Sequence, residues 1–86
     1  MKDRGVIMKA KVFVTLKKAV LDPQGKAVGG ALASMGYSEV KGLRIGKFIE
    51  VEIDASSKQD AEKRLKEMCE KLLANTVVED YRVEVE

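Results

Sequence analysis

Histidine and tryptophan are absent from the sequence, and its 86 residues include one cysteine and one proline. Without histidine, the chain lacks the commonest general base and the commonest metal ligand. Cys69 has neither a disulfide partner nor a histidine to activate it, so we expect a buried structural thiol in a reducing compartment. Cysteine and histidine spacings that bind a metal are missing as well. These absences exclude most familiar kinds of active site.

Long apolar runs are also missing, because no stretch approaches the roughly 20 residues that a bilayer span needs. The N-terminal MKDRGVIMK has no apolar region long enough for a signal peptide, so we expect a cytoplasmic protein. Hydrophobic residues at 45% and charged residues at 35% are typical of a folded soluble domain. We expect residues 1–86 to form one domain, with residues 1–7 as a flexible extension before Met8, an alternative start.

Charge is distributed unevenly along the chain, although the net charge is only +2. Residues 1–26 hold seven Lys or Arg against two Asp or Glu, and residues 27–86 hold nine against twelve. A basic N-terminal third could meet an acidic partner or a phosphate. A solvated, charge-balanced surface explains the same asymmetry without any partner, and we favour it.

Residues 40–54, VKGLRIGKFIEVEID, alternate between hydrophobic and polar side chains, which is typical of a half-buried strand. One face, interrupted by Lys47, consists of Leu43, Ile45, Ile49, Val51 and Ile53. The phase does not change across Gly46, so we predict one long strand with a bend there, and not a hairpin. Such a strand would be longer than any other strand that could pair with it. Its unpaired backbone groups would be a template for pairing with another chain.

Four further segments have the patterns of regular structure. Residues 10–17 and 77–85 alternate as strands. Asp22 followed by Pro23 predicts the start of a helix that ends near residue 35 and buries Ala27, Val28, Ala31, Leu32 and Met35. A second helix over residues 58–74, capped by Ser56 or Ser57, is expected to bury Ala61, Leu65, Met68, Cys69 and Leu72.

The order β-α-β-α-β predicts an α+β two-layer sandwich, with a long bent central strand and both helices on one face of an antiparallel sheet. If Gly46 is a true break, the order becomes β-α-β-β-α-β, the ferredoxin-like arrangement. The sheet face away from the helices would carry Phe13 and Phe48 among the charged residues Lys11, Arg44, Glu50 and Arg82. The two phenylalanines form either a cross-strand pair or part of a contact surface, and we favour the contact surface.

Three patterns imitate known chemistry without matching it. Glu50 and Glu52 could form an acid–base pair, but alternating acidic residues are typical of a solvated strand. The glycines of GKAVGG resemble a phosphate loop, but their spacing is not that of a Walker motif and no Lys-Ser or Lys-Thr follows. Phe13 and Phe48 lack the glycine-rich basic signature of an RNA-binding sheet. The residues therefore indicate an oligomer-prone protein without visible catalytic machinery.

Three blocks of the sequence resemble one family. They are VFVTLKKAVLDPQGKAV, LRIGKFIEVEID and MCEKLLANTVVEDYRVEV, at residues 12–28, 43–54 and 68–85. In this order and spacing they are similar to the PurS family, the small subunits of phosphoribosylformylglycinamidine synthase. The chain departs from the family pattern at Asn75-Thr76, where a proline is expected after the asparagine, and in the short extension before Met8.

The resemblance implies a subunit without an active site in de novo purine (IMP) biosynthesis. In this family a glutaminase, PurQ, releases ammonia, and an ATP-dependent subunit, PurL, uses it to convert a formamide to an amidine. The resemblance implies that PurS bridges the two, supports ammonia transfer and forms a dimer or a dimer of dimers. It also implies that ATP and Mg²⁺ are bound by PurL, and that this chain binds no cofactor, metal, membrane or nucleic acid.

The same resemblance indicates partner contacts at the turn 21–25, at the bend 44–47 and near Asn75. Each position also has a structural explanation as a helix cap, a bend or a helix stop. Lys17, Lys18, Arg44 and Lys47 have no expected core role, which favours them for partner contact or electrostatic steering. The complete predicted interface consists of Lys17, Lys18, Leu21, Asp22, Arg44, Lys47, Phe13 and Phe48.

Two other classes of function stay open on the sequence. A ferredoxin-like regulatory module would bind an amino acid or nucleotide at a dimer interface, and a metabolite would then shift its thermal stability. A basic RNA-binding domain would show binding that weakens steeply with salt.

Overall fold

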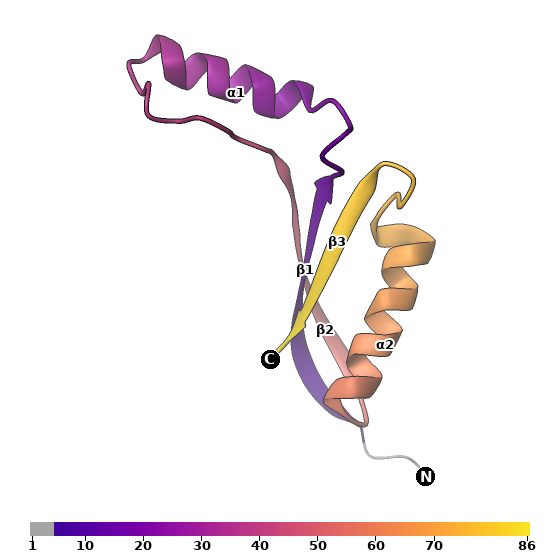
Figure 1. Cartoon of the computed structure of the whole chain (residues 1–86). Helices are drawn as coiled ribbons and strands as arrows, with labels where there is room; N and C mark the ends of the chain where they lie inside the picture. The colour runs from indigo at the N-terminus through magenta and orange to yellow at the C-terminus, as the bar shows by residue number, and fades with distance from the viewer. Residues whose placement is uncertain (1–4) are drawn as a thin grey trace.

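The computed structural model describes residues 5–86 as three strands and two helices, the second helix ending in a short π-helical turn (Figure 1). In chain order the elements are β1 (Val6–Leu16), α1 (Pro23–Ser34), β2 (Gly46–Ala55), α2 (Lys58–Met68), the π-helical turn η1 (Cys69–Leu73) and β3 (Glu79–Val85). The predicted α+β class and β-α-β-α-β order are confirmed.

β1 begins earlier than the sequence pattern predicted. Val6 and Ile7 pair with Ala55 and Asp54 of β2, so the prediction of a flexible extension over residues 1–7 is wrong for these two residues. Residues 1–4 of that predicted extension lie outside the described residues.

The sheet is antiparallel with the order β2-β1-β3, so β1 is the central strand and β2 lies at an edge. The prediction of a long central strand over residues 40–54 is wrong, because β2 begins only at Gly46. β1 spans 11 residues and β2 spans 10. Every residue of β2 pairs with β1, so no part of β2 extends beyond its partner. Residues 40–45 lie beyond the reach of β1, which ends at Leu16. Glycine suits this boundary because a Cβ there would collide with the Val14 carbonyl oxygen.

α2 covers one face of the sheet and completes the core. Ser57 caps the helix by accepting a hydrogen bond from the Asp60 amide at 3.0 Å, as the sequence predicted. The largest fully buried side chains are Leu65, Val12, Val14 and Cys69. The apolar side of α2 therefore packs against the apolar face of the sheet, and the charged side of α2 faces solvent.

The π-helical turn changes which leucine faces the core. Leu72, predicted to be buried, is 82% exposed, whereas Leu73 packs against the cluster of Val12 and Cys69. Met68, also predicted to be buried, is 36% exposed. A π-helical turn takes about one more residue than an α-helical turn, so it rotates the following side chains by one position. The predicted helical stripe is therefore wrong at its C-terminal end.

α1 does not lie on the sheet, and the prediction of two helices on one face is wrong in this respect. Residues 17–45, which we call the arm, project beyond the end of the sheet and carry α1 away from α2 (Figure 1). The radius of gyration is 17.1 Å, compared with about 12 Å for a compact chain of this length. Gly25 is the only buried residue of α1, and its predicted core residues are exposed except for the half-buried Leu32.

The core predicts the effect of a truncation in α2. Leu65→Ala should lower the free energy of unfolding by about 2–5 kcal/mol, because it leaves a cavity in a fully buried site. Lys63→Ala, on the exposed side of the same helix, should change it by less than about 0.5 kcal/mol. Urea unfolding followed by circular dichroism measures both, and equal effects would contradict this packing.

Candidate functional site

Asp22 joins the two ends of the arm. One carboxylate oxygen accepts a hydrogen bond from the Gly25 amide at 2.9 Å and caps α1. The other accepts from the Ile45 amide, also at 2.9 Å, on the segment that returns to β2. These two amide donors, with the nearby Arg44, lower the pKa of Asp22 below its ordinary value. The capping role predicted for Asp22 is confirmed, and the bond to Ile45 is a second role that the sequence did not indicate.

Arg44 fastens the same junction from the other side. Its guanidinium donates to the carbonyl oxygens of Leu16 and Lys17, at 2.8 and 3.0 Å. We call this junction, residues 16–22 and 43–46, the elbow. Arg44 was expected on the outer sheet face, and that expectation is wrong because the residue precedes β2 and bonds to the end of β1. It lies outside the core, as predicted.

The remaining basic residues of the predicted interface differ in their surroundings. Lys17 forms an ion pair with Asp80 at 3.6 Å, and Lys47 donates to the Leu73 carbonyl oxygen at 3.4 Å. Lys18 and Leu21 lie at the tip of the elbow, where Lys18 is exposed and Leu21 is 69% exposed. The elbow thus brings most of the predicted residues together, and Lys18, Leu21 and Arg44 are exposed within it.

Phe13 and Phe48 lie directly opposite each other on β1 and β2, on the sheet face away from α2. Their ring centroids are 5.2 Å apart, and the planes are inclined by 23°. The Arg82 guanidinium sits 4.2 Å from the centroid of the Phe13 ring. The two phenylalanines form the cross-strand pair, and Phe48 remains 54% exposed. Their part in a contact surface stays a prediction.

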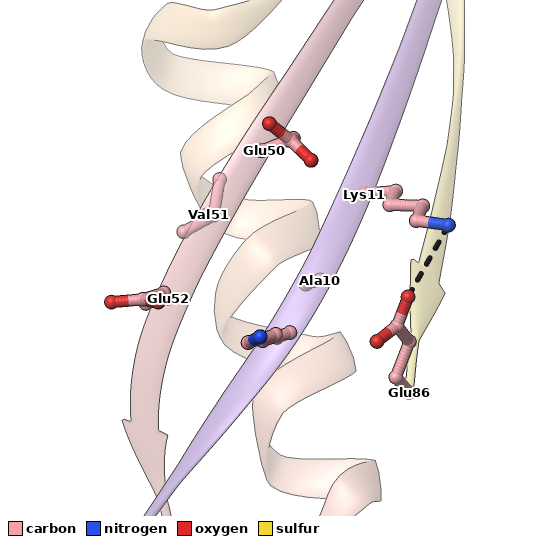
Figure 2. Close-up of a pocket in the computed structure, with 7 residues that line it drawn as sticks. Ala10, Lys11, Glu50, Val51, Glu52 and Glu86 are labelled. Carbon is pink, nitrogen blue, oxygen red and sulfur yellow. Dashed lines mark ion pairs between the residues drawn. The ribbon is translucent and has the colours of Figure 1, made fainter.

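A shallow pocket lies near the end of β3 (Figure 2), lined by Lys9, Ala10, Lys11, Glu50, Val51, Glu52 and Glu86. Lys11 pairs with Glu86 at 3.2 Å, and in the sheet register it faces Glu50. The pocket is therefore lined by oppositely charged side chains that face each other across neighbouring strands. This arrangement is typical of a solvated strand surface. Within residues 5–86, no group of three acidic or cysteine side chains could hold a metal ion.

Two ionisable groups near η1 have shifted pKa values. Burial raises the pKa of the Cys69 thiol, which favours the unreactive protonated form. The Tyr81 hydroxyl donates to the Glu70 carboxylate at 2.8 Å, and this bond raises the tyrosine pKa. The predicted burial of Cys69 is confirmed.

Asn75 ends the helical segment, as predicted. Its side-chain oxygen accepts from the Val77 amide at 3.2 Å, and its own amide donates to the Glu79 carboxylate at 2.7 Å. These bonds build the turn that leads into β3. The partner contact expected near Asn75 stays a prediction.

Sequence reasoning missed one surface, the apolar side of α1, because it placed that side in the core. Val28 is 41% exposed and Met35 is 68% exposed. At the adjacent Gly29 and Gly30, no described atom outside the backbone of α1 lies within 4 Å of the space that a Cβ would take. The helical pattern identified the side correctly but could not say what covers it.

The fold and these surfaces define a class: a small α+β domain with a projecting arm, whose candidate site is a set of exposed surfaces. The family model PurS, described as phosphoribosylformylglycinamidine (FGAM) synthase, matches residues 9–86. The chain therefore belongs to the PurS family, which confirms the resemblance of its three sequence blocks.

Individual relatives agree with this assignment. The PurS subunit of phosphoribosylformylglycinamidine synthase from Bacillus subtilis is 62% identical over 91% of this chain and 92% of its own length. The corresponding subunit of Synechocystis is 45% identical over 87% of this chain and 75% of its own length. A crystal form of Bacillus subtilis PurS superposes with a TM-score of 0.80 at 61% identity, covering 92% of this chain and 98% of the other.

A second solved structure places a relative in an assembly. A chain in the structure of PurLQS from Thermotoga maritima superposes with a TM-score of 0.87 at 36% identity. The match covers 94% of this chain and 99% of the other. No helix within residues 5–86 of the present chain is both long and apolar enough to cross a membrane.

The shared role of Asp22 predicts a titration. The lowered pKa means that the carboxylate stabilises the elbow above its unfolded pKa of about 3.9. This contribution disappears as the pH falls through the lower, folded pKa. The amide proton shifts of Gly25 and Ile45, followed by NMR, should therefore move together with a midpoint below about 3.9.

Two variants test whether the Asp22 carboxylate causes that titration. Asp22→Asn should abolish the common movement of both amides, because no titrating oxygen remains beside them. Glu39→Gln, at an exposed acidic residue of the same arm, should leave it unchanged. Independent midpoints for the two amides would contradict a single shared carboxylate.

Proposed function

We propose that this chain is the non-catalytic assembly subunit of phosphoribosylformylglycinamidine synthase in de novo purine biosynthesis. In this proposal it bridges the glutaminase chain, PurQ, and the ATP-dependent chain, PurL, in the cytoplasm. The observation that carries the proposal is the close match, over 94% of this chain, to a chain of the PurLQS structure from Thermotoga maritima. The enzyme is an ATP- and glutamine-dependent C–N ligase, and this chain contributes to it as a subunit.

The chemistry divides between the partners. PurQ generates ammonia from glutamine, and PurL binds ATP and Mg²⁺ and activates the formamide oxygen that ammonia displaces. The described part of the present chain contributes surfaces to this division: an arm, an elbow and an outer sheet face. Two of its ionisable side chains serve the fold, since Asp22 bonds to the Ile45 amide in the elbow and Tyr81 bonds to Glu70. The chain would support ammonia transfer by holding PurQ and PurL in a fixed relative position.

The predicted interface residues that are exposed to solvent are the candidates for direct partner contact. Lys18 and Leu21 at the elbow tip, and Phe48 on the outer face, are exposed enough to meet a partner directly. Leu21 offers an apolar anchor next to a positive charge, a combination suited to an acidic surface with an apolar pocket. Asp22 and Arg44 act indirectly, because their hydrogen bonds set the position of the tip.

Reconstitution with purified PurL and PurQ tests the proposal. Omitting this chain should abolish amidine formation with glutamine and spare the reaction with free ammonia, because only the glutamine reaction needs both catalytic chains together. Equal glutamine-dependent activity without this chain would contradict the proposal. In that case a metabolite-dependent thermal shift of the isolated chain would point to a regulatory ligand module.

Variants at the elbow tip sharpen the same assay. Leu21→Glu should weaken co-purification with PurL and PurQ by at least about tenfold, because it places a charge where an apolar anchor is expected. Lys63→Glu, on the exposed side of α2, is the matched control and should leave co-purification unchanged. An unaffected Leu21→Glu complex would remove the elbow tip from the interface.

A further inference from the structure

A groove crosses the arm between α1 and the segment that runs back along it toward β2 (Figure 1). It consists of two recesses, of about 390 and about 270 Å³. Lys26 and Leu43 line both recesses, so the two are continuous. Lys26 and Val28 are two residues apart, which separates their side chains by about 200° around the helix. The groove and the apolar side of α1 are therefore different surfaces of the arm.

The groove gathers the positive charge that the rest of the chain does not balance. The arm holds five of the 16 Lys or Arg but only two of the 14 Asp or Glu, so the remainder is close to neutral. Four of these five basic residues line the groove: Lys18, Lys26, Lys41 and Arg44. Among the described residues the three lysines form no ion pair, whereas Lys17, outside the groove, pairs with Asp80. Asp22 is the one acidic residue among the described residues that line the groove, and both its oxygens already accept amide hydrogen bonds.

Lys26 stands where the helix itself does not favour a cation. It lies in the first turn of α1, and no acidic residue in that turn offsets it. The free amide groups at the start of a helix carry a partial positive charge, so the fold gains nothing from a lysine there. A negatively charged occupant of the groove would relieve this repulsion.

Open glycines in the second recess leave room for another main chain. At Gly29 and Gly30, no described atom outside the backbone of α1 lies within 4 Å of the space that a Cβ would take. The same space at Gly42, across the recess, has only its chain neighbours nearby. Glycines often mark places where another backbone approaches closely. None of the described residues that line the groove is aromatic, whereas single-stranded RNA is bound by stacking its bases on aromatic side chains. The lining therefore favours a peptide over a nucleic acid.

We propose that the groove binds an extended acidic segment of a partner chain in the synthase, with carboxylates on the four cations and main chain against the open glycines. The proposal rests on the bridging role and deepens it by stating the chemistry of one contact. Lys18 and Arg44 line one recess, Lys41 lines the other, and Lys26 lies where they meet. Cations spaced along a groove match carboxylates spaced along an extended chain. Leu21 and Leu43 add an apolar wall to the first recess.

Zero-length cross-linking of the complex with PurL and PurQ tests the groove directly. A carbodiimide joins a lysine amine only to a carboxyl group that touches it. Mass spectrometry should find Lys26 and Lys41 linked to aspartates or glutamates within one short segment of one partner. Lys58 and Lys63, exposed on α2, are internal controls and should give no link to that segment. A complex in which the groove lysines reach partner carboxyls no more often than these controls would overturn the proposal.

Charge reversal tests the same contact without cross-linking. Lys26→Glu/Lys41→Glu should lower co-purification with PurL and PurQ at least about tenfold, because it sets like charges against each other. Lys26→Glu also places a carboxylate where the start of a helix favours one, so α1 should stay folded. Lys58→Glu/Lys63→Glu, which makes the same change of net charge on α2, should leave co-purification unchanged. Equal losses from the two double variants would reduce the contact to general charge attraction and overturn the proposal.

Gly30→Leu tests the approach of a main chain without changing any charge. The space at Gly30 is open and leucine favours a helix, so α1 should be at least as stable as before. Co-purification should nevertheless fall at least about tenfold, because the side chain would fill the second recess. Gln59→Leu, exposed on α2, is the matched control and should have no effect. An unaffected Gly30→Leu complex would overturn the extended segment.

The outcomes also separate this proposal from the bridging role. If the groove variants assemble normally, while omission of the chain still abolishes the glutamine reaction, the groove proposal fails and the bridging role stands. If a fluorescein-labelled oligouridylate binds the unmodified chain but not Lys26→Glu/Lys41→Glu, and assembly is unaffected, the groove belongs to a nucleic acid and the proposal is overturned.

Discussion

The carboxylate of Asp22 sets the shape of the whole chain. Its two oxygens hold the first turn of α1 and the segment that returns to β2, and Arg44 ties that segment to the end of β1. With both connections fastened together, α1 is directed away from its own sheet. The exposure of the apolar side of α1 follows from this constraint. A chain of 86 residues becomes 60 Å long and leaves surfaces that need other chains.

Local chemistry was readable from the sequence. Asp22-Pro23 and Ser57 predicted two helix starts, and the alternation of β1, β2 and β3 placed Phe13 and Phe48 on one outer face. These features depend on residues close in sequence or on a period of two, so they need no knowledge of the tertiary structure. The same holds for the burial of Cys69, which follows from its place on a helical stripe.

Long-range features were not readable in the same way. The alternation continues smoothly from residue 40 to residue 54, but pairing stops at Gly46 because β1 ends there. The apolar side of α1 was identified correctly, but it was expected on the chain's own sheet, where it does not lie. Periodicity does not say which surface a helix meets. The π-helical turn exchanged Leu72 for Leu73 in the core without any sequence signal of its own. Within the elbow, the sequence indicated Asp22 and Arg44 but not the hydrogen bonds that join them to Ile45 and Leu16.

Sedimentation velocity of the unmodified chain across a range of micromolar concentrations tests the central claim most directly. The claim is that this fold is one part of an assembly, because it leaves the apolar side of α1 exposed. The account predicts a species of at least two chains of 9.5 kDa each. Monomer should be detectable only at the lowest concentrations. A monomer at every concentration, with α1 still helical, would show that the arm is stable uncovered and would contradict the account.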